Sequence, residues 1–162
     1  MMELRIALPK DHAAIHTLVL ETFDAPEEAA LVTALRNKNE IADEWVAVAQ
    51  EVVIGHLALS HMDAPAGALA LAPVSVRPTA QKQGVASALI KAALAKAKSD
   101  GWTCAVVLGD PDYYSRFGFD VGRAANFETP YPNAYTGIIV FDAPKFAILP
   151  KKLIYPATFD GV

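Results

Sequence analysis

The segment from residue 67 to residue 109 constrains the fold more than any other part of the chain. It begins with "GALALAPVSVRP", an apolar run that predicts a strand over Ala68–Arg77. "QGVASALIKAALAKAKSDG" then predicts a helix from Gln83 to about Ser99, with Gly101 just after its end. The nearly continuous apolar run "WTCAVVLG" predicts a strand that is covered on both faces. A strand, a helix and a strand in this order favour a right-handed crossover between parallel strands.

Shorter elements surround this unit. Apolar spacing predicts strands Glu3–Leu8, Glu44–Gln50 and Val52–Met62, helices Asp11–Phe23 and Pro26–Asn39, a short helix in "PDYYSRFGF" and a strand Gly137–Ala143. Asp11 is the expected N-cap of the first helix, and the tail "AILPKKLIYPATF" is expected to add final strands. We therefore expect the α/β (α+β) class, with three layers around a mixed sheet of about six to seven strands and about four helices.

Composition limits the possible functions. The 162 residues are 53% hydrophobic, which suits one domain with its own core. The net charge of -4 argues against a broad surface for nucleic acid. The single cysteine, Cys104, lies in an apolar run, which favours a buried structural thiol and a reducing compartment. The N-terminus lacks a signal-peptide pattern and no apolar run approaches ~18 residues, so we expect a cytoplasmic protein without membrane, nucleic-acid or metal partners.

Pro73 interrupts the strand that opens the crossover unit. Proline has no N–H for the hydrogen-bond ladder and is tolerated only at an edge, a bulge or a break in pairing. We therefore expect this strand to part from a neighbour near Pro73. The parted strand would leave main-chain groups of Val74, Ser75 and Val76 without partners, and an amide-bearing ligand would satisfy them.

The loop that follows, Gln81 to Ala86, suits an anion. Successive N–H groups at the start of a helix, together with the helix dipole, favour negative charge. Gly84 allows close approach of the backbone, Ala86 is small, and Lys82 adds positive charge. A pyrophosphate beside an extended amide-containing arm is what coenzyme A offers. The same strand, turn and helix also occur in α/β proteins that bind no ligand, so these residues alone leave both interpretations open.

Two motifs resemble those of a known family. Gln81, Gly84 and Ala86 match motif A of the GCN5-related N-acetyltransferases (GNAT), Arg/Gln-x-x-Gly-x-Gly/Ala after a strand. "YYSRFGF" resembles the later Tyr-x-x-x-Gly-Phe element of the same family. "VVLGDPDYYSRFGFDVG" and the late "GIIVFDAPKFAILPKKLIYPATF" resemble its YhbS-type branch of predicted acetyltransferases. The resemblance covers nearly the whole chain.

The resemblance implies a GNAT fold over residues 1–162 and an acetyl-CoA-dependent N-acetyltransferase. Tyr114 would protonate the departing CoA thiolate, with Tyr113 as the alternative. The acceptor would be an amine of a small molecule, a protein or a peptide, attacking the thioester directly, and a homodimer stays an open option. The pantetheine arm would pair with the backbone of Val74, Ser75 and Val76, and the cradle around Gln81 would hold the pyrophosphate on Lys82, Gln83, Gly84, Val85, Ala86 and Ser87.

The chain also departs from the family pattern. Gly109 and Asp110 stand where many relatives have an asparagine, and Asp110 is the expected cap of the short helix. The strand "LALAPVSV" carries no carboxylate to act as general base, so water, the solvent, or a residue from elsewhere would take the proton. The missing carboxylate keeps open a non-catalytic acyl-CoA-binding or interaction module. Transfer to an oxygen acceptor, or of a longer acyl group, is a third alternative.

Other candidate residues have two interpretations each. His56 and His61 are candidate bases because imidazole in general titrates near neutral pH, but their spacing of five puts them on opposite faces of a regular strand, so at most one faces a cleft. A segment at residues 128–137 borders the acceptor pocket or is a plain surface loop. The acidic residues in and after the first helix line a site for a cationic amine or form a solvated helix face; these are Glu21, Asp24, Glu27 and Glu28.

Overall fold

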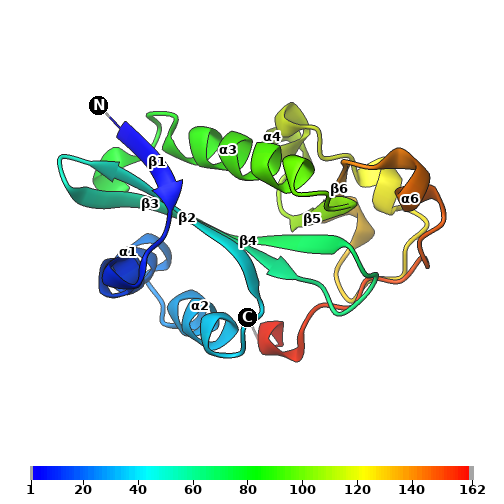
Figure 1. Ribbon diagram of the computed structural model, residues 1–162, viewed down its shortest axis with the longest axis horizontal. Coiled ribbons are helices and arrows are strands. Elements are labelled where there is room, and N and C mark those ends of the chain that lie inside the picture. The colour runs from blue at the N-terminus through cyan, green and yellow to red at the C-terminus, as the bar shows by residue number, and fades with distance from the viewer. Residues whose placement is uncertain (1, 161–162) are drawn as a thin grey trace.

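A six-stranded sheet forms the centre of the protein in the computed structural model, which describes residues 2–160. The strands lie in chain order, and every neighbouring pair is antiparallel except β4 and β5, which are parallel. Figure 1 shows the sheet between layers of helices. The strands are β1 (Met2–Ile6), β2 (Ile41–Ala49), β3 (Val52–His61), β4 (Ala68–Val76), β5 (Cys104–Leu108) and β6 (Thr136–Val140).

Helices cover both faces of this sheet. α1 (His12–Phe23) and α2 (Glu27–Asn37) lie on one face, and α3 (Val85–Ser99) lies on the other (Figure 1). Each long helix buries one apolar stripe, such as Leu89, Ile90 and Ala93 of α3, because the 3.6-residue period places these side chains toward the sheet. The expected three-layer α/β arrangement around a mixed sheet is confirmed.

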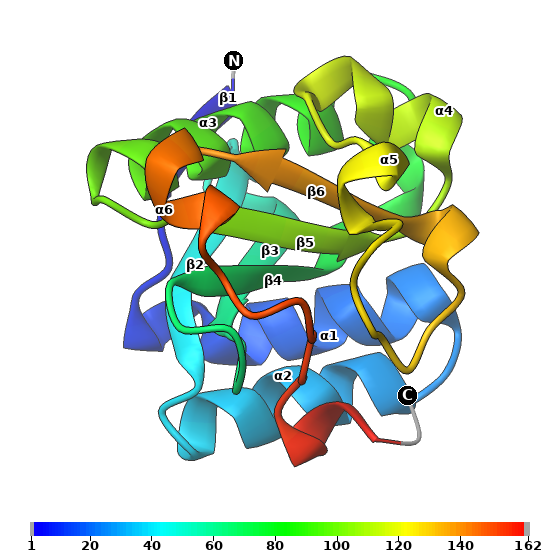
Figure 2. The ribbon, with the colours of Figure 1, turned by 90° about the vertical axis from the view of Figure 1, so that its right-hand side faces the viewer.

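Short helices occupy the second half of the chain. They are α4 (Pro111–Tyr114), α5 (Val121–Ala124) and α6 (Ala143–Ala147), with single 3-10 turns at Pro9–Asp11, Pro78–Ala80, Ser115–Phe117, Asn133–Tyr135 and Ala157–Phe159. After α6 the chain runs down past β4 to α2 (Figure 2). This C-terminal segment closes one side of the core with Leu153 and Phe159.

The expected strands at the C-terminal end were partly wrong. β6 ends at Val140 rather than at residue 143, because Asp142 accepts a hydrogen bond from the Lys145 N–H and caps α6, which has proline in its first turn. Beyond α6, within the part of the chain that the structure describes, only isolated bridges form, between Ala64 and Ile154 and between Glu128 and Lys152.

Asp11 does not cap α1 as expected. Its carboxylate instead accepts hydrogen bonds from the Arg5 guanidinium at 2.7 and 3.0 Å and from the Leu8 N–H at 2.7 Å. The Arg5 hydrogen bond outweighs burial and lowers the pKa of Asp11 to about 2. The side chain therefore ties β1 to the start of α1.

The β2–β3 hairpin closes through two residues with positive φ, Gln50 at 50° and Glu51 at 65°. Two-residue hairpins favour such mirror-image turns because they match the twist of the strands, although glycine or asparagine usually occupies them. The sequence predicted the hairpin but not this turn geometry, because neither residue favours it.

β4 parts from β5 where the sequence predicted a break. The two strands pair only from Ala68–Cys104 to Leu71–Val107. On its other edge β4 keeps pairing with β3, but the register shifts between Leu57 and Leu59, so Ala72 and Pro73 lie in a bulge. The prediction for Pro73 is confirmed, and the parting opens a gap between two neighbouring strands in the middle of the sheet.

Candidate active site

Two cavities meet at this gap, and Val74 lines both. The cradle cavity, of about 500 Å³, is lined by Thr22, Val74, Val76, Gln81, Lys82, Gly84, Val85, Ala86, Ser87, Tyr113 and Arg116. The apolar cavity, of about 270 Å³, is lined by Phe23, Glu28, Leu31, Ala70, Leu71, Ala72, Pro73, Val74, Val106, Leu108, Tyr114, Tyr131, Tyr155 and Phe159. A molecule that threads the gap would therefore have one end in each cavity.

The backbone of β4 presents two of the three predicted residues to the gap. The Arg77 N–H donates to the Ile54 carbonyl at 2.8 Å, so Arg77 and Ile54 form a hydrogen-bonded pair at the end of the antiparallel β3–β4 ladder. Such pairs alternate along an antiparallel ladder, so Ser75 also bonds to β3 while Val74 and Val76 turn their N–H and C=O groups toward the gap. The Ser75 side chain is buried on the sheet.

The Val76 carbonyl anchors the loop. It accepts hydrogen bonds from the Gln81 side-chain amide at 3.1 Å and from the Thr22 hydroxyl at 3.1 Å. The motif glutamine therefore holds the loop against β4, and Thr22 ties α1 to the same point. Thr22 was not predicted, because nothing in its local sequence indicates a contact with a residue 54 positions away.

The loop before α3 exposes its backbone to the cradle cavity. Lys82 and Gly84 have positive φ values, 64° and 82°, and α3 begins directly after them at Val85. The first N–H groups of a helix have no partner within the helix, so they remain available to a ligand. A Cβ added at Gly84 would meet no atom within 4 Å, which shows open space beside the backbone.

Of the predicted cofactor-binding residues, Ser75 and Gln83 do not line this cavity. The Gln83 side chain turns back and donates to the Thr79 carbonyl at 3.4 Å. The other predicted residues, Val74, Val76, Gln81, Lys82, Gly84, Val85, Ala86 and Ser87, come together around the cavity.

Arg116 adds a second cation to the cradle cavity. Its guanidinium lies 4.7 Å from the centre of the Tyr113 ring, which holds it at the cavity wall. Arg116 was not predicted, although the basic residue within "YYSRFGF" is a signal in the sequence that could have indicated it. The cavity therefore combines free main-chain N–H groups with Lys82 and Arg116.

The two adjacent tyrosines face different cavities: Tyr113 lines the cradle cavity and Tyr114 lines the apolar cavity. The Tyr114 ring packs on Gly109, where an added Cβ would lie 2.5 Å from the ring atom Cε2. Burial, and then Tyr113, raise the pKa of the Tyr114 phenol. Asp110 accepts a hydrogen bond from the Asp112 N–H at 3.0 Å, which confirms that it caps the short helix α4.

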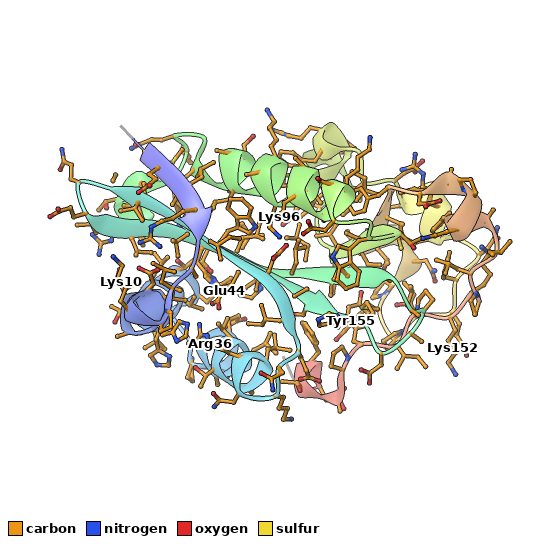
Figure 3. The ribbon with its side chains drawn as sticks, in the orientation of Figure 1. Lys10, Arg36, Glu44, Lys96, Lys152 and Tyr155 are labelled. Carbon is orange, nitrogen blue, oxygen red and sulfur yellow. The ribbon has the colours of Figure 1, made fainter. Side chains whose placement is uncertain are left out.

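Neither histidine of β3 lines either cavity. His56 is fully buried, with its Nε2 2.8 Å from the Glu44 carboxylate, and His61 packs on Trp102 with ring centres 5.2 Å apart. The two rings lie on opposite faces of the sheet, as their spacing predicted. His56 thereby joins a structural cluster with Glu44 and Arg36, whose guanidinium lies 2.6 Å from the Glu44 carboxylate; Figure 3 labels Glu44 on the side of the sheet that α2 covers and Arg36 at α2.

One of the four acidic candidates reaches the site. Glu28 lines the apolar cavity, whereas Glu21, Asp24 and Glu27 are exposed and line neither cavity. Tyr131 is the residue of the 128–137 segment that borders the apolar cavity. A larger hollow of about 770 Å³ lies outside the Tyr131–Tyr155 pair, but no residue of the β4–β5 gap lines it.

Cys104 is not a nucleophile of this site. Its thiol is buried, and burial raises the pKa to about 11. Over residues 2–160, no cluster of three metal-ligating side chains occurs, and no helix has the length and apolar character needed to cross a membrane.

Comparisons with known proteins identify the family. The model of the "Acetyltransferase (GNAT) family" matches residues 12–119. "Uncharacterized N-acetyltransferase YhbS" of Escherichia coli K12 is 33% identical over 135 residues, 81% of each chain. The crystal structure of GNAT family N-acetyltransferase YhbS from Escherichia coli with CoA has a TM-score of 0.91 at 27% identity, covering 98% of this chain and 92% of that one. A GNAT family acetyltransferase from Brucella melitensis with acetyl-CoA has a TM-score of 0.82 at 30% identity, covering 99% of each chain.

These matches confirm the resemblance that the two motifs indicated. The family match includes β4, the loop before α3 and Tyr114, so it spans most of both cavities at the gap. The chain belongs to the GNAT family of acetyltransferases and has the GNAT fold.

Proposed function

We propose that residues 1–162 act as one acetyl-CoA-dependent N-acetyltransferase domain, which moves an acetyl group from the CoA thioester to an amine by direct attack. The observation that carries this proposal is the β4–β5 gap, where a cavity suited to a nucleotide meets a cavity suited to an acceptor. The single buried thiol of Cys104 supports the reducing cytoplasm as its location.

The residues of the cradle cavity fit acetyl-CoA. The main-chain groups of Val74 and the Val76 N–H face the gap and suit the amides of the pantetheine arm, whereas the Val76 carbonyl already accepts from Thr22 and Gln81. The free N–H groups at the start of α3, with Lys82 and Arg116 beside them, suit the pyrophosphate. Ser75 and Gln83 do not line the cavity, so the proposed contact set leaves them out.

Tyr114 is the proposed acid. When bound, acetyl-CoA supplies the thioester carbonyl that an unprotonated amine attacks, and its sulfur leaves as a thiolate. Tyr114 keeps its proton at neutral pH, because its pKa is raised above the usual value near ~10, and its phenol can donate that proton to the sulfur. Its place in the apolar cavity supports this role, while Tyr113 is held on the cradle side under Arg116.

The proton that the amine loses goes to water in this proposal. β4 carries no carboxylate and neither His56 nor His61 lines a cavity, while the Glu28 carboxylate lines the acceptor cavity, where it suits binding of the amine. Positioning of the two reactants would then supply most of the acceleration. The missing carboxylate also favours a second candidate function, a non-catalytic acyl-CoA-binding module on the same fold.

Thiol release from acetyl-CoA distinguishes the two candidates. We expect release with at least one member of a panel of primary amines, and a loss of turnover in Tyr114→Phe of about 10²- to 10⁴-fold. Acetyl-CoA affinity, measured by calorimetry, should be unchanged in that variant, and Tyr113→Phe serves as the matched control. Tight binding of acetyl-CoA without release across the panel, which also includes alcohols, would establish the binding module instead.

A further inference from the structure

The apolar cavity has one charged side chain among the described residues that line it, Glu28. The remaining walls are aliphatic and aromatic, from the end of α1, α2, β4, β5 and the C-terminal segment. One carboxylate among apolar walls, in the same cavity as the proposed acid Tyr114, selects for a positively charged group, since a neutral ligand would leave the charge unmatched.

Glu28 is half-buried, and one of its two carboxylate oxygens lacks a partner. Its Oε2 atom is buried, and no residue within 2–160 donates a hydrogen bond to it. Glu27 and Glu28 both lie in the first turn of α2, where the helix dipole favours either of them, but Glu27 is exposed to solvent. A buried carboxylate oxygen without a hydrogen-bond donor is costly. The helix dipole alone therefore does not explain why the Glu28 side chain lines the cavity.

Aromatic rings complete an environment for a cation. Tyr131 and Tyr155 meet edge to face with centres 5.1 Å apart, and both line the cavity together with Phe23 and Phe159. The Tyr155 hydroxyl is also buried without a hydrogen-bond partner in the described part of the chain. Figure 3 shows Tyr155 on the C-terminal segment. The faces of aromatic rings attract ammonium groups, and a phenol oxygen can accept a hydrogen bond from an ammonium N–H.

The size and charge of the cavity limit the rest of the acceptor. A volume of about 270 Å³ lies just below the range of about 300–1,000 Å³ for drug-sized ligands, so the buried body is small. No lysine or arginine lines the cavity within residues 2–160. A carboxylate on the ligand would therefore be buried next to Glu28 without a cation to pair with it.

We propose that this cavity binds the acceptor as a primary ammonium on a small apolar body without a neighbouring carboxylate, and that Glu28 binds the ammonium. The bound ammonium loses one proton to water before its nitrogen attacks the thioester, as in the proposed function. The inference rests on the proposed function, because it defines the acceptor of that reaction. A free aralkyl or alkyl amine and a lysine side chain share this chemistry.

Phenethylamine is the probe for the test. Its binding to CoA-loaded protein is measured by calorimetry and its acetylation by steady-state kinetics, in wild type, Glu28→Gln and the matched control Glu27→Gln. We expect Glu28→Gln to raise the Kd and KM for phenethylamine about 10- to 100-fold, through loss of a charge-assisted hydrogen bond. Acetyl-CoA affinity should stay constant, which also shows that the variant is folded, and Glu27→Gln should match wild type.

Three further ligands test whether the cavity requires a positive charge without a carboxylate, and whether the amine belongs to a free molecule or to a protein. Phenylalanine, which adds a carboxylate, and 2-phenylethanol, which lacks the charge, should each bind at least about tenfold more weakly than phenethylamine. A lysine peptide blocked at both ends distinguishes a protein amine from a free one: stronger binding of the peptide assigns the site to lysine side chains, and stronger binding of phenethylamine assigns it to free amines.

The failure of this inference can be told apart from failure of the proposed function. Equal phenethylamine affinity in wild type and Glu28→Gln overturns the inference, even where acetylation occurs and the proposed function holds. Binding that depends on Glu28 without any acetylation supports the inference and contradicts the proposed function. Absence of binding by every amine overturns the inference.

Discussion

Replacing Glu44 with glutamine tests the buried ion cluster between β2 and α2. The Glu44 carboxylate is 9% exposed, accepts hydrogen bonds from Arg36 at 2.6 and 3.2 Å, and lies 2.8 Å from His56 Nε2. Burial alone would raise the pKa of Glu44, but the hydrogen bonds with His56 and Arg36 lower it from 4.5 to about 2.

The size of this shift gives the expected effect. At about 1.4 kcal/mol per unit, the lowered pKa of Glu44 corresponds to about 3 kcal/mol of stabilisation at neutral pH. Because the folded pKa lies below the unfolded one, the stabilisation is complete above pH 4.5 and is lost as the pH falls toward about 2. We expect Glu44→Gln to lower the free energy of unfolding by about 3 kcal/mol at pH 7, and the difference from wild type to shrink by about 2 kcal/mol at pH 3.

Urea denaturation followed by tryptophan fluorescence measures both values. Glu3→Gln, which removes an exposed carboxylate on β1, is the control and should stay within about 0.5 kcal/mol of wild type. Asp11 also has a pKa lowered to about 2, but wild type and Glu44→Gln lose its contribution equally in acid. A loss below about 1 kcal/mol at pH 7, or a difference that is as large at pH 3, would refute the assignment of this stability to the Glu44 charge.

Three other substitutions give distinct results. Gly84→Glu should abolish acetyl-CoA binding by placing a carboxylate in the cradle cavity. The control Gly84→Ala has the same backbone strain at φ 82° and should still bind acetyl-CoA in calorimetry. Equal acetyl-CoA affinity of the two variants would contradict this expectation. Glu51→Gly should stabilise the hairpin by about 1 kcal/mol and raise the Tm by about 2–4 °C, and an unchanged Tm would count against strain there. Gly109→Ala should displace the Tyr114 ring and lower kcat about tenfold or more with acetyl-CoA affinity unchanged; a normal kcat would show that ring position is unimportant.

Local patterns in the sequence predicted the parts of the protein that local chemistry controls. Pro73 has no N–H in any fold, so the break beside β4 could be predicted from one residue. The cradle cavity could be predicted because the small residues Gly84 and Ala86 and the unpaired N–H groups at the start of α3 are also local features of the chain. The long helices followed from apolar spacing, since each packs one stripe on the sheet.

Contacts between distant segments could not be predicted in this way. Thr22 meets Val76 across 54 positions, and only the packing of α1 on the sheet brings them together. Among four neighbouring acidic residues, the turn of α2 toward the C-terminal segment selects Glu28 for the cavity. The helix α6 was missed because the apolar run before it hid the capping signal of Asp142.

A crystal structure of the protein with CoA bound is the most direct test of the central claim, that the β4–β5 gap positions a thioester between two cavities. We expect the pantetheine amides on main-chain groups of Val74 and on the Val76 N–H, the pyrophosphate on residues 82–87, and the sulfur within about 3–4 Å of the Tyr114 hydroxyl. CoA bound outside the gap, or a Tyr114 hydroxyl turned away from the sulfur, would contradict it.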